Sequence, residues 1–318
     1  MAAPPICGNC GSALPRAAMV CPRCGRPVYL LRERRALRRR NASVVGMAGA
    51  LLMGLQSAFM LVGGAIALVA LSIATRGDLS GARGIADVAA IFVGLTLLFD
   101  LVGVSLLIVS FHHHTRAARA ETGLAGPDSA RHSLAFYSLL ATLFLALWLL
   151  VTLAWRGALA AIVSFYPTPF SGAVQLPDLA GLRRAASIML GLWAAAAFLL
   201  FLGAVFGTRF LMRTRGVPLT FPRLLWPLET LVHAGAACAI LVLAPGLLTS
   251  LQIEVSTLGL IQTLGVIELL VVPILGLLAY AFLFHDFLRL YRSAEEEGRE
   301  SRAAPVAPAP ADPPAGEG

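Results

Sequence analysis

The chain has 318 residues, of which 58% are hydrophobic and 13% are charged, and its mean hydropathy is +0.80. Ordinary soluble domains carry about 25% charged residues, so this composition excludes a soluble globule as well as collagenous, disulfide-stapled and wholly disordered chains. The net charge of +8 arises from 25 basic residues, all arginine, and 17 acidic residues. Of these 42 charged residues, 21 lie in the two segments that flank residues 44–284. The arithmetic therefore indicates a membrane protein with polar ends.

The first 28 residues carry two CxxC pairs, formed by Cys7 with Cys10 and by Cys21 with Cys24. Each pair places two thiolates on one tight turn, and two such turns that face each other form the tetrahedral four-sulfur set that zinc prefers. A glycine after the second cysteine of a pair tolerates positive φ in such a turn. We predict one structural Zn²⁺ ion. Iron is the alternative metal, and two disulfides are disfavoured on a reducing cytoplasmic face.

The segment CGNCGSALPRAAMVCPRCG resembles the short zinc-ribbon family, whose pattern is two CxxCG knuckles bridged by a ten-residue hairpin. The resemblance covers residues 6–27, includes the Leu14-Pro15 turn and does not extend into the rest of the chain. It implies a small β-hairpin module with a metal and does not imply a reaction. We expect residues 1–28 to form this zinc ribbon.

Residues 29–43 form a basic juxtamembrane linker. Arginine beside a membrane span sets the topology and binds anionic lipid headgroups. A nucleic-acid-binding surface would need aromatic side chains interleaved with the arginines, and Tyr29 is the only candidate for base stacking. We expect a lipid-facing basic cluster and no nucleic-acid partner. Its members are Arg32, Arg34, Arg35, Arg38, Arg39 and Arg40.

Six apolar segments are long enough to cross a hydrocarbon core of ~30 Å, which takes about 20 helical residues. In chain order they cover residues 44–75, 85–111, 133–155, 187–207, 225–248 and 259–284. The sequence thus predicts an all-α membrane protein, with a six-helix transmembrane bundle over 44–284 behind the zinc-ribbon module. Ridges of small residues, Gly46 with Ala50 in the first span and Gly191 with Ala195 in the fourth, favour close helix packing.

The arginines predict the orientation of these spans. With the amino terminus inside, 20 arginines fall on the cytoplasmic side and five on the outer side. This asymmetry predicts a multi-pass protein of the cell (inner) membrane with both termini cytoplasmic. Residues 285–318 would form a cytoplasmic tail, which we expect to be mostly disordered because its end is rich in proline and alanine.

Four ionisable side chains lie well inside the predicted spans, away from their first residues: Asp100, Glu229, His233 and Glu268. An ionised side chain at the bilayer centre costs ~2.5–3.5 kcal/mol on insertion scales, so such residues are functional candidates. Counting ~1.5 Å per residue from the helix ends places His233 near the depth of Asp100, and Glu268 deeper, where it needs another partner. These groups either line a polar path for protons or a small cation, or join helices by hydrogen bonds.

The sequence contains no HExxH motif, Walker loop or Rossmann fingerprint, so we expect no enzyme. The favoured interpretation is an adaptor or regulatory component, whose head presents a docking surface to a cytoplasmic protein partner. The alternative is a small-solute or proton-coupled transporter that uses Asp100, His233 and Glu268. The sequence names neither the partner nor the substrate.

Overall fold

The computed structural model of the protein describes residues 7, 10, 12–14, 20–25, 28–76, 78–125, 129–165, 179–215, 221–247, 260 and 263–303. Six long helices, and a π-helical turn η1 that leads into the last of them, make up the bundle. These elements are α1 (Val28–Thr75), α2 (Leu79–Ala125), α3 (Ser129–Phe165), α4 (Leu179–Arg215), α5 (Phe221–Leu247), η1 (Ile267–Val271) and α7 (Val272–Ala303). Each of the six helices contains a segment long and apolar enough to cross a membrane, and the architecture fits the predicted multi-pass membrane protein.

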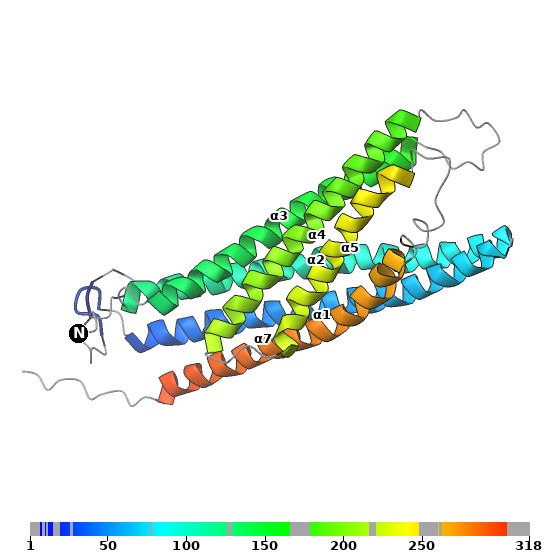
Figure 1. The fold of residues 1–318 in the computed structure, drawn as a ribbon. Helices are drawn as coiled ribbons and strands as arrows, with labels where there is room; N and C mark the ends of the chain where they lie inside the picture. The colour runs from blue at the N-terminus through cyan, green and yellow to red at the C-terminus, as the bar shows by residue number, and fades with distance from the viewer. Residues whose placement is uncertain are drawn as a thin grey trace, which may run out of the picture.

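The helices form a closed ring. Each helix packs against its neighbours in the chain, and α7 packs against both α5 and α1 (Figure 1). The start of α1 and the end of α7 therefore lie at the same end of the bundle, which we call the terminal end. An ion pair between Arg39 and Glu297, 3.1 Å long, joins the two helices there. The even number of crossings brings both ends of the helical part to one side.

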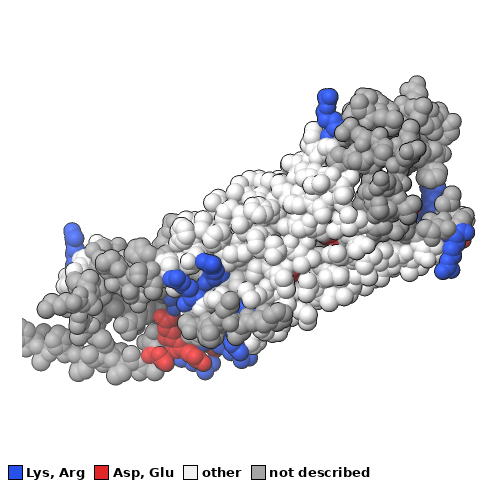
Figure 2. All heavy atoms as spheres, in the orientation of Figure 1, with Lys and Arg blue, Asp and Glu red and all other residues white. Residues whose placement is uncertain are grey.

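The outer surface matches a lipid environment. Large apolar side chains point outward, such as Leu51 at 56% exposure, Ile91 at 64% and Leu150 at 64%. In Figure 2 the arginine, aspartate and glutamate side chains gather toward the two ends of the visible face, and the surface between them is almost free of charge. Such a wide apolar surface is unusual for a protein in water and ordinary for one in a bilayer.

Small residues set the approach of α1 to its neighbours. A Cβ atom at Gly46 would lie 2.5 Å from the Phe287 ring of α7, and one at Gly49 would lie 2.9 Å from the Gly103 carbonyl oxygen of α2. The small-residue ridge of the first span is therefore confirmed as a packing surface. The ridge predicted in the fourth span is wrong, because a Cβ at Gly191 would meet no atom of the described residues within 4 Å.

The reason lies in how α4 is rotated. The face of α4 that meets α5 carries Ala194 and Ala197, which form a buried cluster with Ala234 and Ala237. Ala195 is exposed, on the other side of the helix. A ridge of small residues thus indicates a possible contact, whereas the position of the neighbouring helix decides which small residues are used.

Aromatic side chains fill the core near the terminal end. The Phe111 ring of α2 lies 5.9 Å from the Phe287 ring of α7 and 6.3 Å from the Trp226 ring of α5, between ring centroids. Phe210 of α4 meets Phe111 edge to face at 5.8 Å. All four side chains are at least 97% buried, so this aromatic layer closes the centre of the ring of helices.

The helices extend beyond the predicted spans at the terminal end. The predicted linker, 29–43, is helical and belongs to α1. The tail expected to be mostly disordered is instead helical through Ala303, and residues 304–318 lie outside the described residues. Two ion pairs lie within this extension: Glu295 with Arg299 along α7, at 2.8 Å, and Arg39 with Glu297 between helices.

Candidate functional site

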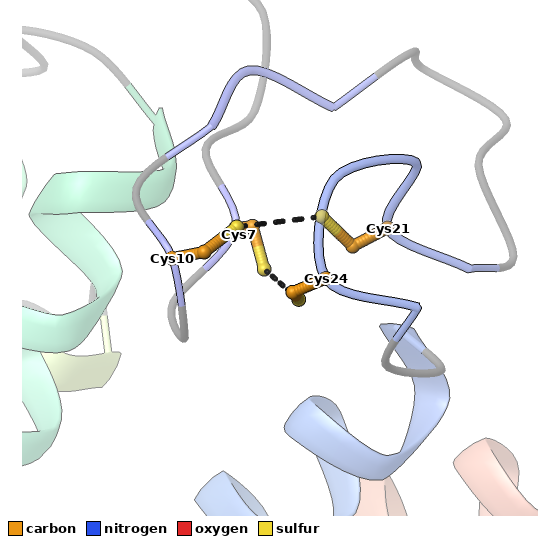
Figure 3. Close-up of side chains that lie close together, drawn as sticks. All are labelled: Cys7, Cys10, Cys21 and Cys24. Carbon is orange, nitrogen blue, oxygen red and sulfur yellow. Dashed lines mark hydrogen bonds between the residues drawn. The ribbon is translucent and has the colours of Figure 1, made fainter.

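The first candidate site is the cysteine cluster of the head. The four sulfur atoms of Cys7, Cys10, Cys21 and Cys24 all lie within 4.8 Å of one another. The Cys10 sulfur is 3.5 Å from the Cys21 sulfur, and the Cys7 sulfur is 3.7 Å from the Cys24 sulfur (Figure 3). Metal–sulfur bonds of ~2.3 Å in a tetrahedron place the sulfurs about 3.8 Å apart, whereas a disulfide needs ~2.05 Å. The four cysteines are free thiols placed so that they can hold a metal ion.

Local backbone geometry positions these sulfurs. Gly25 has φ of 67°, a conformation that glycine adopts without strain, and its N–H donates to the Cys21 carbonyl at 2.9 Å. On the other knuckle the Cys7 N–H donates to the Ser12 carbonyl at 2.7 Å. Leu14 is 97% buried against Cys7 and Cys21 and supplies the small apolar core of the head.

The predicted β-hairpin is only partly within the described residues. Ala13 and Val20 each have the backbone pairing of an isolated β-bridge. Pro15, at the predicted turn, lies outside the described residues. The hairpin of the zinc ribbon thus stays a prediction.

Ser12 is a residue of this site that sequence reasoning missed. Its hydroxyl oxygen lies 3.0 Å from the Cys10 sulfur and 3.2 Å from the Cys21 sulfur. Hydrogen bonding to Ser12 lowers the pKa of Cys21 to about 6, with backbone N–H groups of the same knuckle adding to the effect, and it also lowers the pKa of Cys10. The thiolate is the form that binds metal, so Ser12 favours the ligand state. A polar residue directly after the first CxxCG turn is the signal that would have found it.

The basic cluster beside the head has a mixed environment. Arg38 is exposed and Arg40 is half-buried, while Arg39 pairs with Glu297 of α7. One of the arginines expected to face lipid therefore contacts a carboxylate of the protein. The side chains of the other three members, Arg32, Arg34 and Arg35, lie outside the described residues.

The second candidate site is a cavity of about 210 Å³ inside the bundle, bordered by all six helices and η1. The four intramembrane residues predicted from the sequence all line it, although they come from α2, α5 and η1. Arg156 of α3, which the sequence placed in an outer loop, lines it as well. The ionisable lining residues are Asp100, Arg156, Glu229, His233 and Glu268.

Two contacts between ionisable side chains join helices at this cavity. Arg156 Nη2 donates to Asp100 Oδ2 at 3.0 Å, and His233 Nδ1 lies 2.8 Å from Glu268 Oε2. The predicted meeting of His233 with Asp100, with Glu268 left deeper, is wrong. That estimate assumed parallel helices with all ends in one plane, whereas the helices start at different levels and run at different angles (Figure 1).

A backbone irregularity places Glu268. Pro273 has no N–H and cannot donate to the carbonyl four residues before it, so a regular helix is interrupted there. The Val272 N–H donates instead to the Ile267 carbonyl, five residues back, which closes the π-helical turn η1. Such turns often occur at functional sites, and this one carries Glu268 to the cavity, where it is 91% buried.

Polar atoms around the cavity have unused hydrogen-bonding capacity. Five buried atoms that belong to its lining have no hydrogen-bond partner among the described residues. A buried polar group without a partner costs about 1–3 kcal/mol, so the lining favours a bound polar molecule or water. These atoms are Thr152 Oγ1, Trp155 Nε1, Arg156 Nε, Glu229 Oε2 and Glu268 Oε1.

The cavity is separated from the terminal end by the aromatic layer. Asp100 and Phe111 are eleven residues apart on α2, which corresponds to about 16 Å along a helix. Beyond this layer Arg223 of α5 pairs with Asp286 of α7 at 3.5 Å, and both side chains are about nine-tenths buried. Access to the cavity from the terminal end therefore requires movement of the aromatic side chains.

The chain matches no protein-family model, no curated protein and no solved structure. Its function is therefore argued from the geometry of the cysteine cluster and of the cavity.

Proposed function

We propose that this protein is a proton-coupled transporter of a small polar solute, which binds in the central cavity. One observation carries the proposal: five ionisable residues from four elements converge on a single cavity within the bundle. Ionisable groups inside a membrane are costly and mark solute or proton pathways. Small-molecule sites are concave, and a few polar groups fix the ligand within them.

The arrangement around His233 supplies the proton chemistry. An ordinary imidazole titrates near neutral pH. His233 contacts Glu268 directly and shares its cavity with Glu229, Asp100, Arg156 and Tyr280. A proton can pass between the imidazole and a carboxylate there without entering the apolar surroundings. In this proposal Asp100 and Arg156 hold α2 and α3 together at the edge of the same cavity.

Reconstitution tests the proposal. Full-length protein in liposomes that contain a pH-sensitive dye is exposed to a panel of small cationic, anionic and neutral solutes. We expect at least one solute to drive a change in internal pH. Glu268→Gln should reduce that change at least tenfold, because the amide keeps the size of the side chain but cannot exchange a proton.

The matched control is Glu300→Gln, the same chemical change at an exposed position near the end of α7. This variant should transport like the wild type. If no solute drives proton movement, or if Glu268→Gln transports normally, the transporter proposal is wrong.

We also propose that the metal is one structural Zn²⁺ ion in a zinc-ribbon head. Four thiolates complete a tetrahedral site and leave no position for substrate, so the ion would stabilise the fold and take no part in a reaction. The donor set supports this assignment, because four sulfurs within 4.8 Å of one another, with two of the pairs at 3.5 and 3.7 Å, suit zinc. Elemental analysis of the purified protein, with one zinc and no iron per chain, is the expected result.

A docking role for the head is the second candidate function. It is favoured by Val20, an apolar side chain that is 49% exposed beside the second knuckle. In this proposal the head faces the cytoplasm and binds a protein partner there. Labelling of Glu300→Cys in a Cys238→Ser background tests the orientation: only a reagent that reaches the cytoplasm should react.

A further inference from the structure

We propose that the ligand of the cavity is a small organic cation, such as a quaternary or protonated amine, that competes with a proton for the cavity carboxylates. This inference rests on the proposed transport function for its physiological meaning. Its physical basis is the lining of the cavity, which combines an excess of acidic groups with a concentration of aromatic rings.

The charge balance of the lining favours a cation. Three carboxylates, from Asp100, Glu229 and Glu268, face one permanent cation, Arg156, and one imidazole, His233. Arg156 is already paired with Asp100 at 3.0 Å. With Arg156 assigned to Asp100, two carboxylates share a single imidazole.

Glu229 is the cavity acid for which the described residues provide no ion pair. Its side chain is 94% buried, and its Oε2 atom has no hydrogen-bond partner within the described part of the chain. The Oε1 atom of Glu268 likewise has no hydrogen-bond partner among the described residues, although the Oε2 atom of Glu268 contacts His233. A buried carboxylate is stable when it is protonated or when a cation lies beside it. The two oxygens therefore define a place that takes either a proton or a cation.

The aromatic residues specify an organic cation. Three of the four tryptophans in the chain, Trp148, Trp155 and Trp193, line the cavity, and Tyr280 joins them. Aromatic faces attract ammonium ions through the ring quadrupole, most strongly for tryptophan, and rings around a carboxylate are a way to bind quaternary ammonium groups. A hydrated metal ion would gain little from these rings.

Trp193 lies where the aromatic rings of the lining meet its ionisable groups. Its ring is 5.7 Å from the His233 ring, between centroids, at an interplanar angle of 69°. His233 in turn contacts Glu268 at 2.8 Å. A cation beside Trp193 is therefore close to the imidazole, so its charge disfavours the imidazolium and promotes release of a proton. This geometry couples cation binding to proton release.

The size of the cavity limits the ligand. A volume of about 210 Å³ exceeds the space of a single water and lies below the ~300 Å³ at which drug-sized pockets begin. The cavity suits a compact ammonium ion with few carbon atoms.

Calorimetric binding of tetramethylammonium to the full-length protein in detergent tests this inference. Tetramethylammonium carries no N–H group, so it probes charge and aromatic contact alone. We expect binding that weakens up to tenfold for each unit by which the pH falls, because each bound cation displaces up to one proton. Calorimetry in buffers of different ionisation enthalpy should show that proton release directly. Acetate and sodium ions should not bind measurably.

Variants separate the aromatic contribution from general stability. Trp193→Leu should weaken tetramethylammonium binding at least tenfold, and Trp193→Phe should restore part of it. Phe198→Leu is the matched control, since Phe198 lies on the same helix and is 52% exposed on the outer surface. Glu229→Gln should reduce the pH dependence and leave the part that His233 and Glu268 contribute.

The outcomes distinguish this inference from the transport proposal. Binding and proton release without movement into liposomes would support the organic-cation site and overturn the transporter. Proton-coupled movement of acetate, sodium or a neutral solute, without tetramethylammonium binding, would overturn the organic-cation site and leave the transporter standing. Absence of both would overturn both, and equal binding by Trp193→Leu and the wild type would overturn the aromatic contribution.

Discussion

The head and the cavity both gather side chains that bind small ions, yet they do so in opposite ways. The head takes its four sulfurs from residues 7–24, and they lie together within 4.8 Å of one another (Figure 3). The cavity takes its five ionisable groups from positions 100–268 on four elements, and several of its polar atoms have no partner among the residues described. A site complete in itself suits a permanent metal, whereas an incomplete one suits a ligand that comes and goes.

The largest expected effect is loss of the folded head while the helical bundle stays folded. Cys21→Ser removes one of four ligands, and zinc binding in peptides of this kind contributes ~10–16 kcal/mol at neutral pH. We expect loss of the metal and rapid proteolysis within residues 1–28, with unchanged helical circular dichroism from the bundle. Metal analysis and limited proteolysis measure the two effects.

Cys238→Ser is the control for this change, because Cys238 is the fifth cysteine and is exposed on α5. It should keep both the metal and the protease resistance. Collapse of the bundle in Cys21→Ser would show that the two regions do not fold independently.

The second effect concerns the ion pairs of the cavity. Arg156→Leu leaves Asp100 without its partner, and loss of one member of a largely buried pair costs about 3–5 kcal/mol. The double variant Asp100→Leu with Arg156→Leu should recover most of this loss, since no unpaired charge is left. Reversible unfolding in mixed detergent micelles gives both free energies.

Equal stability of Arg156→Leu and the wild type would mean that water or lipid headgroups solvate Asp100. A double variant no more stable than Arg156→Leu would mean that the packing of the two side chains outweighs their charge.

How far each site could be predicted from the sequence follows from the same contrast. Cys7 and Cys24 are separated by 16 residues, and the spacing of the cysteines alone shows that the chain can bring them together. Asp100 and Arg156 are 56 residues apart on different helices. Hydropathy showed that Asp100 lies in a span, but nothing local indicated which helix would bring its partner.

Two kinds of error were made in predicting the cavity: the direction of Arg156 was missed, and the depth of Glu268 was wrong. Arg156 sits at the end of an apolar segment, where arginine is usual as a topology signal, so its inward direction was missed. Glu268 was assigned a depth by counting along a regular helix, and η1 and the unequal tilt of the helices invalidated the count. Pro273 was the local sign of that irregularity. The aromatic lining was also missed, because nothing local in the sequence shows that α3 and α4 turn their tryptophans to the same cavity.

A smaller effect is expected when the serine that contacts the ligand sulfurs is changed. Ser12→Ala removes the hydroxyl next to the Cys10 and Cys21 sulfurs and keeps all four ligands. Loss of such a partner typically costs 10–100-fold in metal affinity, so competition with a chelator should show weaker binding by that factor. The head should stay folded when zinc is in excess. Ser12→Thr, which keeps a hydroxyl, should retain part of the affinity.

The smallest effect is expected for two glycine-to-alanine changes, at Gly46 and at Gly191. Each glycine is followed by another small residue four positions later. At Gly46 a methyl group would lie 2.5 Å from the Phe287 ring, so Gly46→Ala should cost about 1 kcal/mol, the low end of the usual range for overpacking, because only one methyl group is added. At Gly191 a methyl group meets no atom within 4 Å in the part of the chain that the structure describes, and Gly191→Ala should stabilise the helix by about 0.5–1 kcal/mol through reduced backbone freedom. Unfolding of both variants in the same detergent measures the difference. Equal effects would mean that α7 yields at Phe287, and that the ring of helices is held less tightly at the terminal end than the buried aromatic layer implies.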